Sequence, residues 1–192
     1  MQAIAKFHKV SKKQFIIDFK DSFPKYDEAA INDIYASIKL PKRATIGSAG
    51  YDFYTPIDFI LKPHETIKIP TGIRVSINDG WVLAIFPRSG LGFKYRLQLN
   101  NTVGIIDSDY FNSDNEGHIF IKITNDSNED KTVELKAGQG FGQGIFLQYG
   151  IVEDDNTTDE RNGGFFFNNK KKKKIGDFFE PTVFFFIFFF FF

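Results

Sequence analysis

Two aspartates and a tyrosine near the middle of the chain are the side chains best suited to chemistry. The segment Asn101–Tyr110 reads Asn-Thr-Val-Gly-Ile-Ile-Asp-Ser-Asp-Tyr, an apolar β-like run that reaches Asp107. Residues i and i+2 of a strand share a face, so the carboxylates of Asp107 and Asp109 are expected to converge. One of them would then orient water as a general base while the other supports the loop. A simple Asx turn is the alternative interpretation.

A second candidate site follows a predicted strand that ends near Phe86. The segment Pro87–Gly92 reads Pro-Arg-Ser-Gly-Leu-Gly. Ser89 is expected to cap a short helix, whose free amides, together with Arg88 and the serine hydroxyl, would bind an anion. A capped turn without a ligand is the alternative.

Three further segments contain residues of functional interest. Asp52 lies inside a β-like run, where a carboxylate needs a partner such as a buried donor or a metal-bound water; a purely structural aspartate is equally compatible. In Gly138–Gly144 four glycines alternate with Gln139, Phe141 and Gln143, which permits a close approach of a ligand to the backbone. The acidic stretch 153–160 reads as a flexible arm leading to Arg-Asn-Gly-Gly-Phe at 161–165.

The elements that must position these residues divide into a mainly helical segment and a β-rich segment. Residues 1–39 predict an opening strand followed by two helices. Ser11 and Gln14 form a capping-box pattern for a helix that ends near Lys20. A second helix is expected from Asp27–Glu28 onward, with a clear i, i+3, i+4 apolar stripe.

From residue 40 onward, short β-rich runs recur every 8 to 15 residues between turn residues, a pattern typical of an all-β sandwich or barrel. The predicted strands are 51–54, 66–69, 73–77, 81–86, 119–124, 132–135 and 145–148.

Composition excludes several classes of protein. The 192 residues contain 24 basic and 24 acidic side chains, so the broad positive field of a typical nucleic-acid-binding protein is absent, and we expect no nucleic-acid partner. No cysteine is present, which excludes thiol catalysis and thiolate metal sites. The N-terminal residues do not form a signal peptide, and a cytoplasmic location is expected. The three histidines show no metal-binding spacing and are expected at the surface; for His118, which precedes a strand near the Asp107 segment, a supporting role at the site is the alternative.

The last part of the chain has a different composition from the rest. Of 25 phenylalanines, 13 lie between Phe165 and Phe192, next to a run of five lysines at 170–174. We interpret residues 166–192 as a low-complexity tail, disordered or the product of a frameshift. The apolar run 183–192 is too short to span a bilayer, so no membrane association is expected, although a short interfacial anchor is the alternative.

The five segments resemble, in order, the five motifs of the homotrimeric dUTPase family, in particular versions from low-GC Gram-positive bacteria and their phages. The resemblance extends from about Leu40 to Phe165, and the segment around Asp107 is its most specific part. It implies an all-β, jelly-roll-like β-barrel or β-clip domain at 40–150, a flexible arm at 151–165 and a homotrimer with shared active sites. The two predicted helices would form a short N-terminal extension at 1–39.

The resemblance also implies a function, the hydrolysis of dUTP to dUMP and pyrophosphate with Mg²⁺, which limits uracil incorporation into DNA. Asp107 would activate the attacking water, and Tyr110 would lie beneath the deoxyribose. Asp52 would contact the metal through water. The other residues implied in substrate binding divide into a uracil-reading hairpin pocket (Asn101 and the backbone of Gly104–Ile106), a phosphate group (Arg88, Ser89, Gly90 and Gln143) and a fifth-motif group (Arg161 on the γ-phosphate, Phe165 stacked on uracil).

The sequence departs from the family pattern at two places. Gly140 stands where a basic residue is frequent. After Arg161, Gly163, Gly164 and Phe165, the family's Gly-Ser-Thr-Gly is replaced by Phe-Phe-Asn-Asn at 166–169. We therefore expect reduced turnover. A catalytically weak trimeric nucleotide-binding regulator is one alternative function, and a dCTP deaminase is another.

Overall fold

A long central strand organises the largest sheet of the protein. The computed structural model describes residues 2–159 and 161. In its five-stranded sheet, β12 (Gly140–Gln148) lies between β3 (Tyr51–Tyr54) and β7 (Trp81–Pro87). The short strands β2 (Lys42–Arg43) and β9 (Gly104–Ile106) form the two edges, and every pairing is antiparallel. This sheet carries Asp52, Gln143 and the strands that lead to Arg88 and Asp107.

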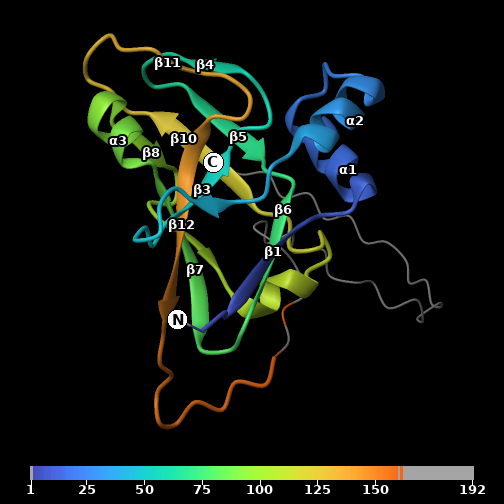
Figure 1. Ribbon diagram of the computed structural model, residues 1–192, viewed down its shortest axis with the longest axis vertical. Helices are drawn as coiled ribbons and strands as arrows, with labels where there is room; N and C mark the ends of the chain where they lie inside the picture. Colours follow the sequence, from blue (N-terminus) through green and yellow to red (C-terminus); the bar gives the residue numbers. More distant parts are fainter. Residues whose placement is uncertain (1, 160, 162–192) are drawn as a thin grey trace, which may run out of the picture.

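The remaining strands form three smaller antiparallel sheets (Figure 1). Their strand orders are β5-β10-β8, β11-β4 and β1-β6. The bounds of these strands are Ala5–Lys9 for β1, Phe59–Leu61 for β4, Thr66–Pro70 for β5, Ile73–Ile77 for β6, Leu97–Leu99 for β8, Phe120–Asn125 for β10 and Val133–Leu135 for β11. The prediction of an all-β domain is confirmed. The four sheets do not join into one closed barrel within the described residues.

The core lies between these sheets and follows the two-residue period of the strands. In β10 the side chains of Ile121 and Ile123 are buried, and Leu83 and Ile85 of β7 are buried with them. Phe141 of β12 completes the same cluster and is fully inaccessible. The alternation fixes which face of each strand lies against the core. It therefore also fixes where the polar residues at the strand ends lie.

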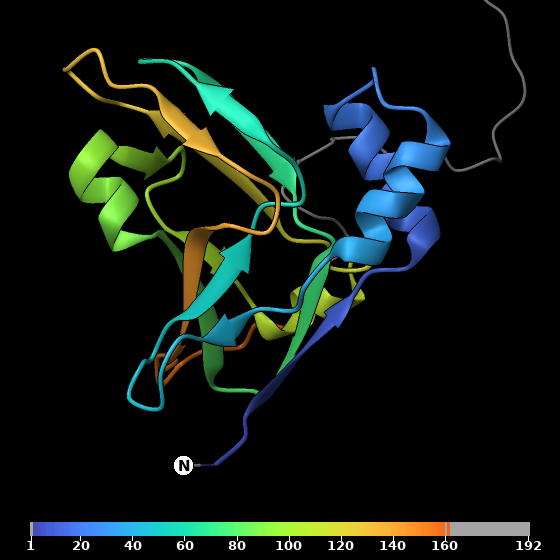
Figure 2. The same cartoon turned by 45° about the horizontal axis from the view of Figure 1, so that its top comes forward.

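Two helices, α1 (Lys12–Ser22) and α2 (Glu28–Ser37), pack together on one side of the strands, opposite the short helix α3 (Ser89–Tyr95) (Figures 1 and 2). Ser11 caps α1 by accepting from the Gln14 amide at 3.1 Å, and Asp27 caps α2 by accepting from the Ala30 amide at 2.8 Å. Both predicted starts are confirmed. Gln14 does not reach back to Ser11, because its amide donates to Asp18 at 2.9 Å.

Sequence and structure differ in three parts of the fold. Six of the seven predicted strands are observed within one residue at each end, but β12 begins at Gly140 rather than 145. Its glycines were interpreted as allowing a ligand to approach the backbone, whereas Gly144 is packed against β7, since a Cβ there would lie 2.7 Å from Leu83 Cδ1. The short strands β2, β4 and β8 were missed. His118, expected at the surface, is fully buried.

No helix in the described part of the chain has the length and apolar character needed to cross a bilayer. The predicted tail 166–192 lies outside the described residues.

Candidate active site

Asp107 stands where the chain leaves the core for the surface. The preceding strand β9 places Gly104 and Ile106 in the interior and leaves Ile105 half exposed. Asp107 is then the N-cap residue of a short 3₁₀ helix, η1 (Ser108–Asn112), and its backbone carbonyl accepts from the Tyr110 amide at 3.2 Å. Its carboxylate makes no cap hydrogen bond and is 43% exposed. A carboxylate held in this way is accessible to water and substrate, and it is not the Asx turn of the alternative interpretation.

The carboxylates of Asp107 and Asp109 converge on one arginine, Arg161. Arg161 Nη2 donates to Asp107 Oδ2, and Arg161 Nε donates to Asp109 Oδ1 at 2.9 Å. The predicted convergence is confirmed, but its stated cause was wrong, since Asp109 lies in η1 and not in a strand. After β12, residues 149–159 loop away from the sheet and return toward η1 (Figure 1).

Tyr110 lies beneath this ion-pair cluster and is 3% exposed. Its hydroxyl donates to the His118 carbonyl at 2.7 Å and accepts from Asn115 Nδ2 at 3.0 Å. Burial raises the pKa of Tyr110 to about 12, because ionisation would place a charge in a poorly solvated position. The Arg161 guanidinium carbon lies 5.9 Å from the centre of the tyrosine ring. Tyr110 is therefore a neutral, fixed support for the groups above it.

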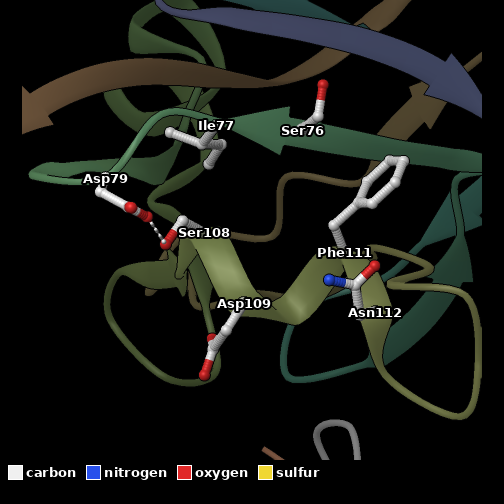
Figure 3. Close-up of a pocket in the computed structure, with 7 residues that line it drawn as sticks. All are labelled: Ser76, Ile77, Asp79, Ser108, Asp109, Phe111 and Asn112. Carbon is white, nitrogen blue, oxygen red and sulfur yellow. Dashed lines mark hydrogen bonds between the residues drawn. The ribbon is translucent and has the colours of Figure 1, made fainter. Parts of the chain in front are cut away.

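Two contacts with strand β6 and the turn after it hold η1 in place. Arg74 donates to the Phe111 carbonyl at 2.5 Å, and its guanidinium carbon lies 3.5 Å from the centre of the Phe111 ring. The Ser108 hydroxyl donates to Asp79 at 3.4 Å across a pocket of about 400 Å³ (Figure 3). Figure 3 shows the Asp109 carboxylate on the far side of η1 from Asp79. The pocket thus backs the helix, and the Asp109 carboxylate points away from the contact between Ser108 and Asp79.

A second polar group forms where β3, β7 and β12 lie side by side. Asp52 of β3 faces Gln143 of β12 across the sheet. Arg88 follows β7 and places Nε 3.2 Å from Asp52 Oδ1, and Gln143 donates to the Pro87 carbonyl at 3.3 Å. Arg88 is 45% exposed while Asp52 is 16% exposed, so the aspartate orients the arginine from below.

A hollow of about 260 Å³ lies beside this group and is lined by Arg88, Ser89, Gly90, Leu91, Leu135, Gln139 and Gly140. The expected serine cap is wrong, because Arg88 is the N-cap residue of α3 and no side chain caps this helix. Ser89 and Gly90 instead occupy the first two helical positions, whose amides have no partner within a helix. The expected grouping of Arg88, Ser89 and Gly90 around one hollow remains. Gly140, where the sequence departs from the family pattern, lies against the Arg88 side chain. A Cβ added at this position would be 2.9 Å from Arg88 Nη1.

Asn101 lies in the turn between β8 and β9 and is exposed. The two strands do not pair with each other, since β8 pairs with β10 and β9 pairs with β7. The expected hairpin pocket is therefore not formed as a paired hairpin, and the turn connects two different sheets. Phe165, Gly163 and Gly164 lie outside the described residues.

The Asp107 group and the Arg88 group belong to opposite ends of β7. Ile106 pairs with Leu83, which places Asp107 level with residue 82, six residues from Arg88. At about 3.3 Å per residue the separation is about 20 Å. No hydrogen bond or ion pair joins the two groups within residues 2–159 and 161.

Three residues outside the predicted site residues support the site, and the sequence suggested a supporting role for His118 alone. His118, Arg74 and Glu116 hold the loop and helix around Tyr110. One signal was present: Asp18 is flanked by Phe15 and Phe19 on the buried face of α1, where a carboxylate requires a partner.

The chain is similar to proteins of known function. A sequence model described as dUTPase matches residues 36–166. The deoxyuridine 5′-triphosphate nucleotidohydrolase of Finegoldia magna is 46% identical over 116 residues, covering 59% of this chain and 76% of the relative. The enzyme of the same name from Lactococcus lactis is 40% identical over 115 residues, covering 59% and 75%.

Solved structures agree with these sequence matches. A dUTPase from Streptococcus mutans superimposes with a TM-score of 0.56 at 32% identity, covering 77% of this chain and 98% of that one. A dUTPase from phage phi11 of S. aureus superimposes with a TM-score of 0.55 at 20% identity, covering 82% and 97%, and supports the fold alone.

Proposed function

The chain belongs to the dUTPase family, and we propose that it hydrolyses dUTP to dUMP and pyrophosphate by attack of water on the α-phosphate. Such a reaction limits the incorporation of uracil into DNA. The observation that carries the proposal is the placement of Asp107, which is exposed at the start of η1 while its carbonyl accepts from the amide of the buried Tyr110. We propose a cytoplasmic location for it.

Asp107 is the group that positions and activates water. General-base catalysis by a positioned carboxylate contributes about 10²–10⁴ in rate. The substrate base and sugar lie beside it: Asn101 and the backbone of Gly104–Ile106 contact the uracil edge, and Tyr110 supports the deoxyribose. The rigid hydrogen bonds of the Tyr110 hydroxyl support this role, because a fixed ring leaves a defined space for the sugar.

The phosphates are bound by the Arg88 group. Arg88, Ser89 and Gly90 line one hollow, and Gln143 pairs with Asp52 in the sheet and donates to the carbonyl of Pro87, the residue before Arg88. Guanidinium and amide donors match phosphate oxygens and stabilise the charge of the transition state. Arg161 approaches the γ-phosphate from the arm, and Phe165 stacks on the uracil.

A homotrimer with shared sites accounts for the separation of the two groups. About 20 Å along β7 separates Asp107 from Arg88 in one chain, too far for both to hold the same phosphate chain. Packing several copies together brings the Arg88 group of one subunit to the Asp107 group of another. The exposed apolar side chains Phe93 and Ile105, next to the two groups, support such contacts.

The residues present fit a Mg²⁺ ion held mainly by the substrate. The described residues contain no group of three or more metal-binding side chains, and Mg²⁺ prefers phosphate oxygens and water over an all-protein cage. Asp52 supplies one hard oxygen donor for a bridging water, while its other contact fixes Arg88. When bound, the ion would neutralise phosphate charge during attack.

The test is the release of pyrophosphate from dUTP with Mg²⁺, beside dCTP, dTTP and UTP, using the full chain. Selective release from dUTP is expected. Ammonia release from dCTP would indicate a deaminase, and binding of dUTP without pyrophosphate release would indicate a regulatory nucleotide-binding protein. Light scattering on the same sample measures the mass, which should correspond to three chains.

A further inference from the structure

The N-terminal extension contacts the loop that holds Tyr110 of the candidate active site. Asp18 of α1 meets His118, with 2.5 Å between Oδ2 and Nδ1. Seven residues earlier in the chain, Ser11 donates to Glu116 from both its amide and its hydroxyl, at 2.7 and 2.6 Å. Both contacts end in the loop 113–118, which connects η1 to β10. The family model begins at residue 36, so both Asp18 and Ser11 lie outside the residues that it matches.

Hydrogen bonding fixes the tautomer of the His118 ring. The Gly72 amide donates to Nε2 at 2.8 Å, so this nitrogen carries no proton. Nδ1 must then carry the proton and donate it to Asp18. The histidine is fully inaccessible and the Asp18 side chain is 14% exposed, so no solvent competes for the histidine nitrogens. The pair is a directional link between α1 and the β domain.

The loop in turn fixes Tyr110 from three sides. The His118 carbonyl accepts from the Tyr110 hydroxyl at 2.7 Å, and Asn115 donates to the same hydroxyl at 3.0 Å. Gly117 packs so closely that an added Cβ would lie 2.6 Å from the Tyr110 carbonyl oxygen. A displacement of the loop therefore displaces the tyrosine.

We propose that Asp18 is a positioning residue for sugar selection: through His118 it sets the depth of the Tyr110 ring, and thereby the discrimination between deoxyribose and ribose. The inference rests on the proposed function, in which Tyr110 supports the sugar. It assigns the N-terminal helices a role beyond the packing of their apolar residues Phe15, Phe19 and Ile31, which form one cluster with Ile57 of the β domain.

The experiment compares Asp18→Ala with Asp18→Asn in the full chain. Alanine removes the acceptor of the His118 proton, whereas asparagine keeps an oxygen at that position. The matched control is Asp21→Ala, which removes another aspartate of α1 whose partner, Lys68 at 2.9 Å, belongs to strand β5 and not to the loop 113–118. The measured quantity is the ratio of kcat/KM for dUTP to kcat/KM for UTP, together with the affinities for non-hydrolysable analogues of both.

Asp18→Ala should lower this ratio about tenfold, mainly by raising kcat/KM for UTP. The reason is that a buried donor without its partner shifts the loop. Asp18→Asn and Asp21→Ala should stay within about twofold of the parent. In a Tyr110→Phe background, Asp18→Ala should cause no further loss, since the hydroxyl that transmits the effect is gone. An Asp18→Ala chain that fails to fold is replaced by Ser11→Ala, which releases the other anchor of the same loop.

Hydrogen exchange of residues 108–118 separates the possible outcomes. Faster exchange in Asp18→Ala with an unchanged dUTP-to-UTP ratio would show a merely structural contact and overturn the proposal, as would unchanged exchange. A parent chain that binds the dUTP analogue selectively but releases no pyrophosphate would overturn the proposed hydrolysis alone, and the affinity ratio would still decide the role of Asp18. A parent chain that binds neither analogue would overturn both.

Discussion

The guanidinium of Arg161 lies against the carboxylate of Asp107 in the same chain, with Nη2 donating to Oδ2. The arginine also reaches Asp109, so both carboxylates of η1 share one cation. A carboxylate engaged with a guanidinium has fewer free lone pairs for water. Binding of a highly charged triphosphate offers Arg161 a better partner, and its transfer to the phosphates would release Asp107 for catalysis.

Replacing Asp107 should remove catalysis while leaving binding intact. In Asp107→Asn the shape is kept but the base is lost, so kcat should fall about 10²-fold or more. The affinity for a non-hydrolysable dUTP analogue, measured by calorimetry, should change less than about threefold. Asp109→Asn is the matched control, since it loses a contact to the same arginine and should keep most of kcat. Equal losses in both variants would contradict the assignment of Asp107 as the base.

Replacing Arg161 should weaken binding of the triphosphate selectively. In Arg161→Ala the KM for dUTP should rise about tenfold, because a charge-assisted contact to phosphate is lost. Arg161→Lys should restore little of this, since an ammonium cannot reproduce the two-point geometry seen with Asp107 and Asp109. The affinity for dUMP, which lacks the γ-phosphate, serves as the internal control. A parallel loss for dUMP and dUTP would exclude a γ-phosphate contact.

Gly140 provides a test of the Arg88 group without touching a charged residue. An added Cβ at residue 140 would lie 2.9 Å from Arg88 Nη1 and 3.0 Å from Arg88 Cδ, so Gly140→Ala must displace the arginine. The displaced atoms belong to a flexible side chain, so stability should change by less than about 1 kcal/mol. The KM for dUTP should nevertheless rise severalfold. Gly47→Ala, where nothing lies within 4 Å, is the control for the substitution itself. An unchanged KM would show that the position of Arg88 is not critical.

Local sequence signals predicted the elements well because each depends on neighbours in the chain. The caps Ser11 and Asp27 mark the starts of α1 and α2, and the alternation in β10 marks a half-buried strand. The start of β12 was missed for the opposite reason. The glycines of this stretch were interpreted as allowing a ligand to approach the backbone, whereas Gly144 is packed against Leu83 and Phe53 of the neighbouring strands, which no local pattern reveals.

The site shows the same division between local and distant information. The motif order led to Asp107, Arg88 and Arg161, because their chemistry is visible in residue type. The supports of Tyr110 could not be found in this way, since Asp18 and His118 are 100 residues apart. The convergence of Asp107 and Asp109 was predicted from strand geometry, but η1 and the arm of Arg161 produce it.

Ionisation of Tyr110 should reduce stability in alkaline solution. Its pKa is raised by burial from 10.0 to about 12, so the folded state favours the neutral form. The resulting stabilisation is fully present below pH 10 and is lost as the pH rises toward 12. Denaturant titrations from pH 9 to 11.5 should therefore show a steeper decline for the parent than for Tyr110→Phe. Tyr149→Phe, at a half-exposed position, is the control. Parallel curves for the parent and Tyr110→Phe would contradict this account.

Restoring the family's fifth motif should raise turnover. The chain reads Phe-Phe-Asn-Asn at 166–169, where the family pattern has Gly-Ser-Thr-Gly, and neither phenylalanine nor asparagine supplies the small hydroxyl groups that would wrap a triphosphate. The variant carries Phe166→Gly, Phe167→Ser, Asn168→Thr and Asn169→Gly and ends at residue 169. Its kcat/KM for dUTP should rise about tenfold or more, as expected for added contacts to a developing charge. A chain ending at residue 165 without the new residues separates removal of the tail from repair of the motif. Equal rates for the repaired chain and the parent would show that residues after 165 do not limit the reaction.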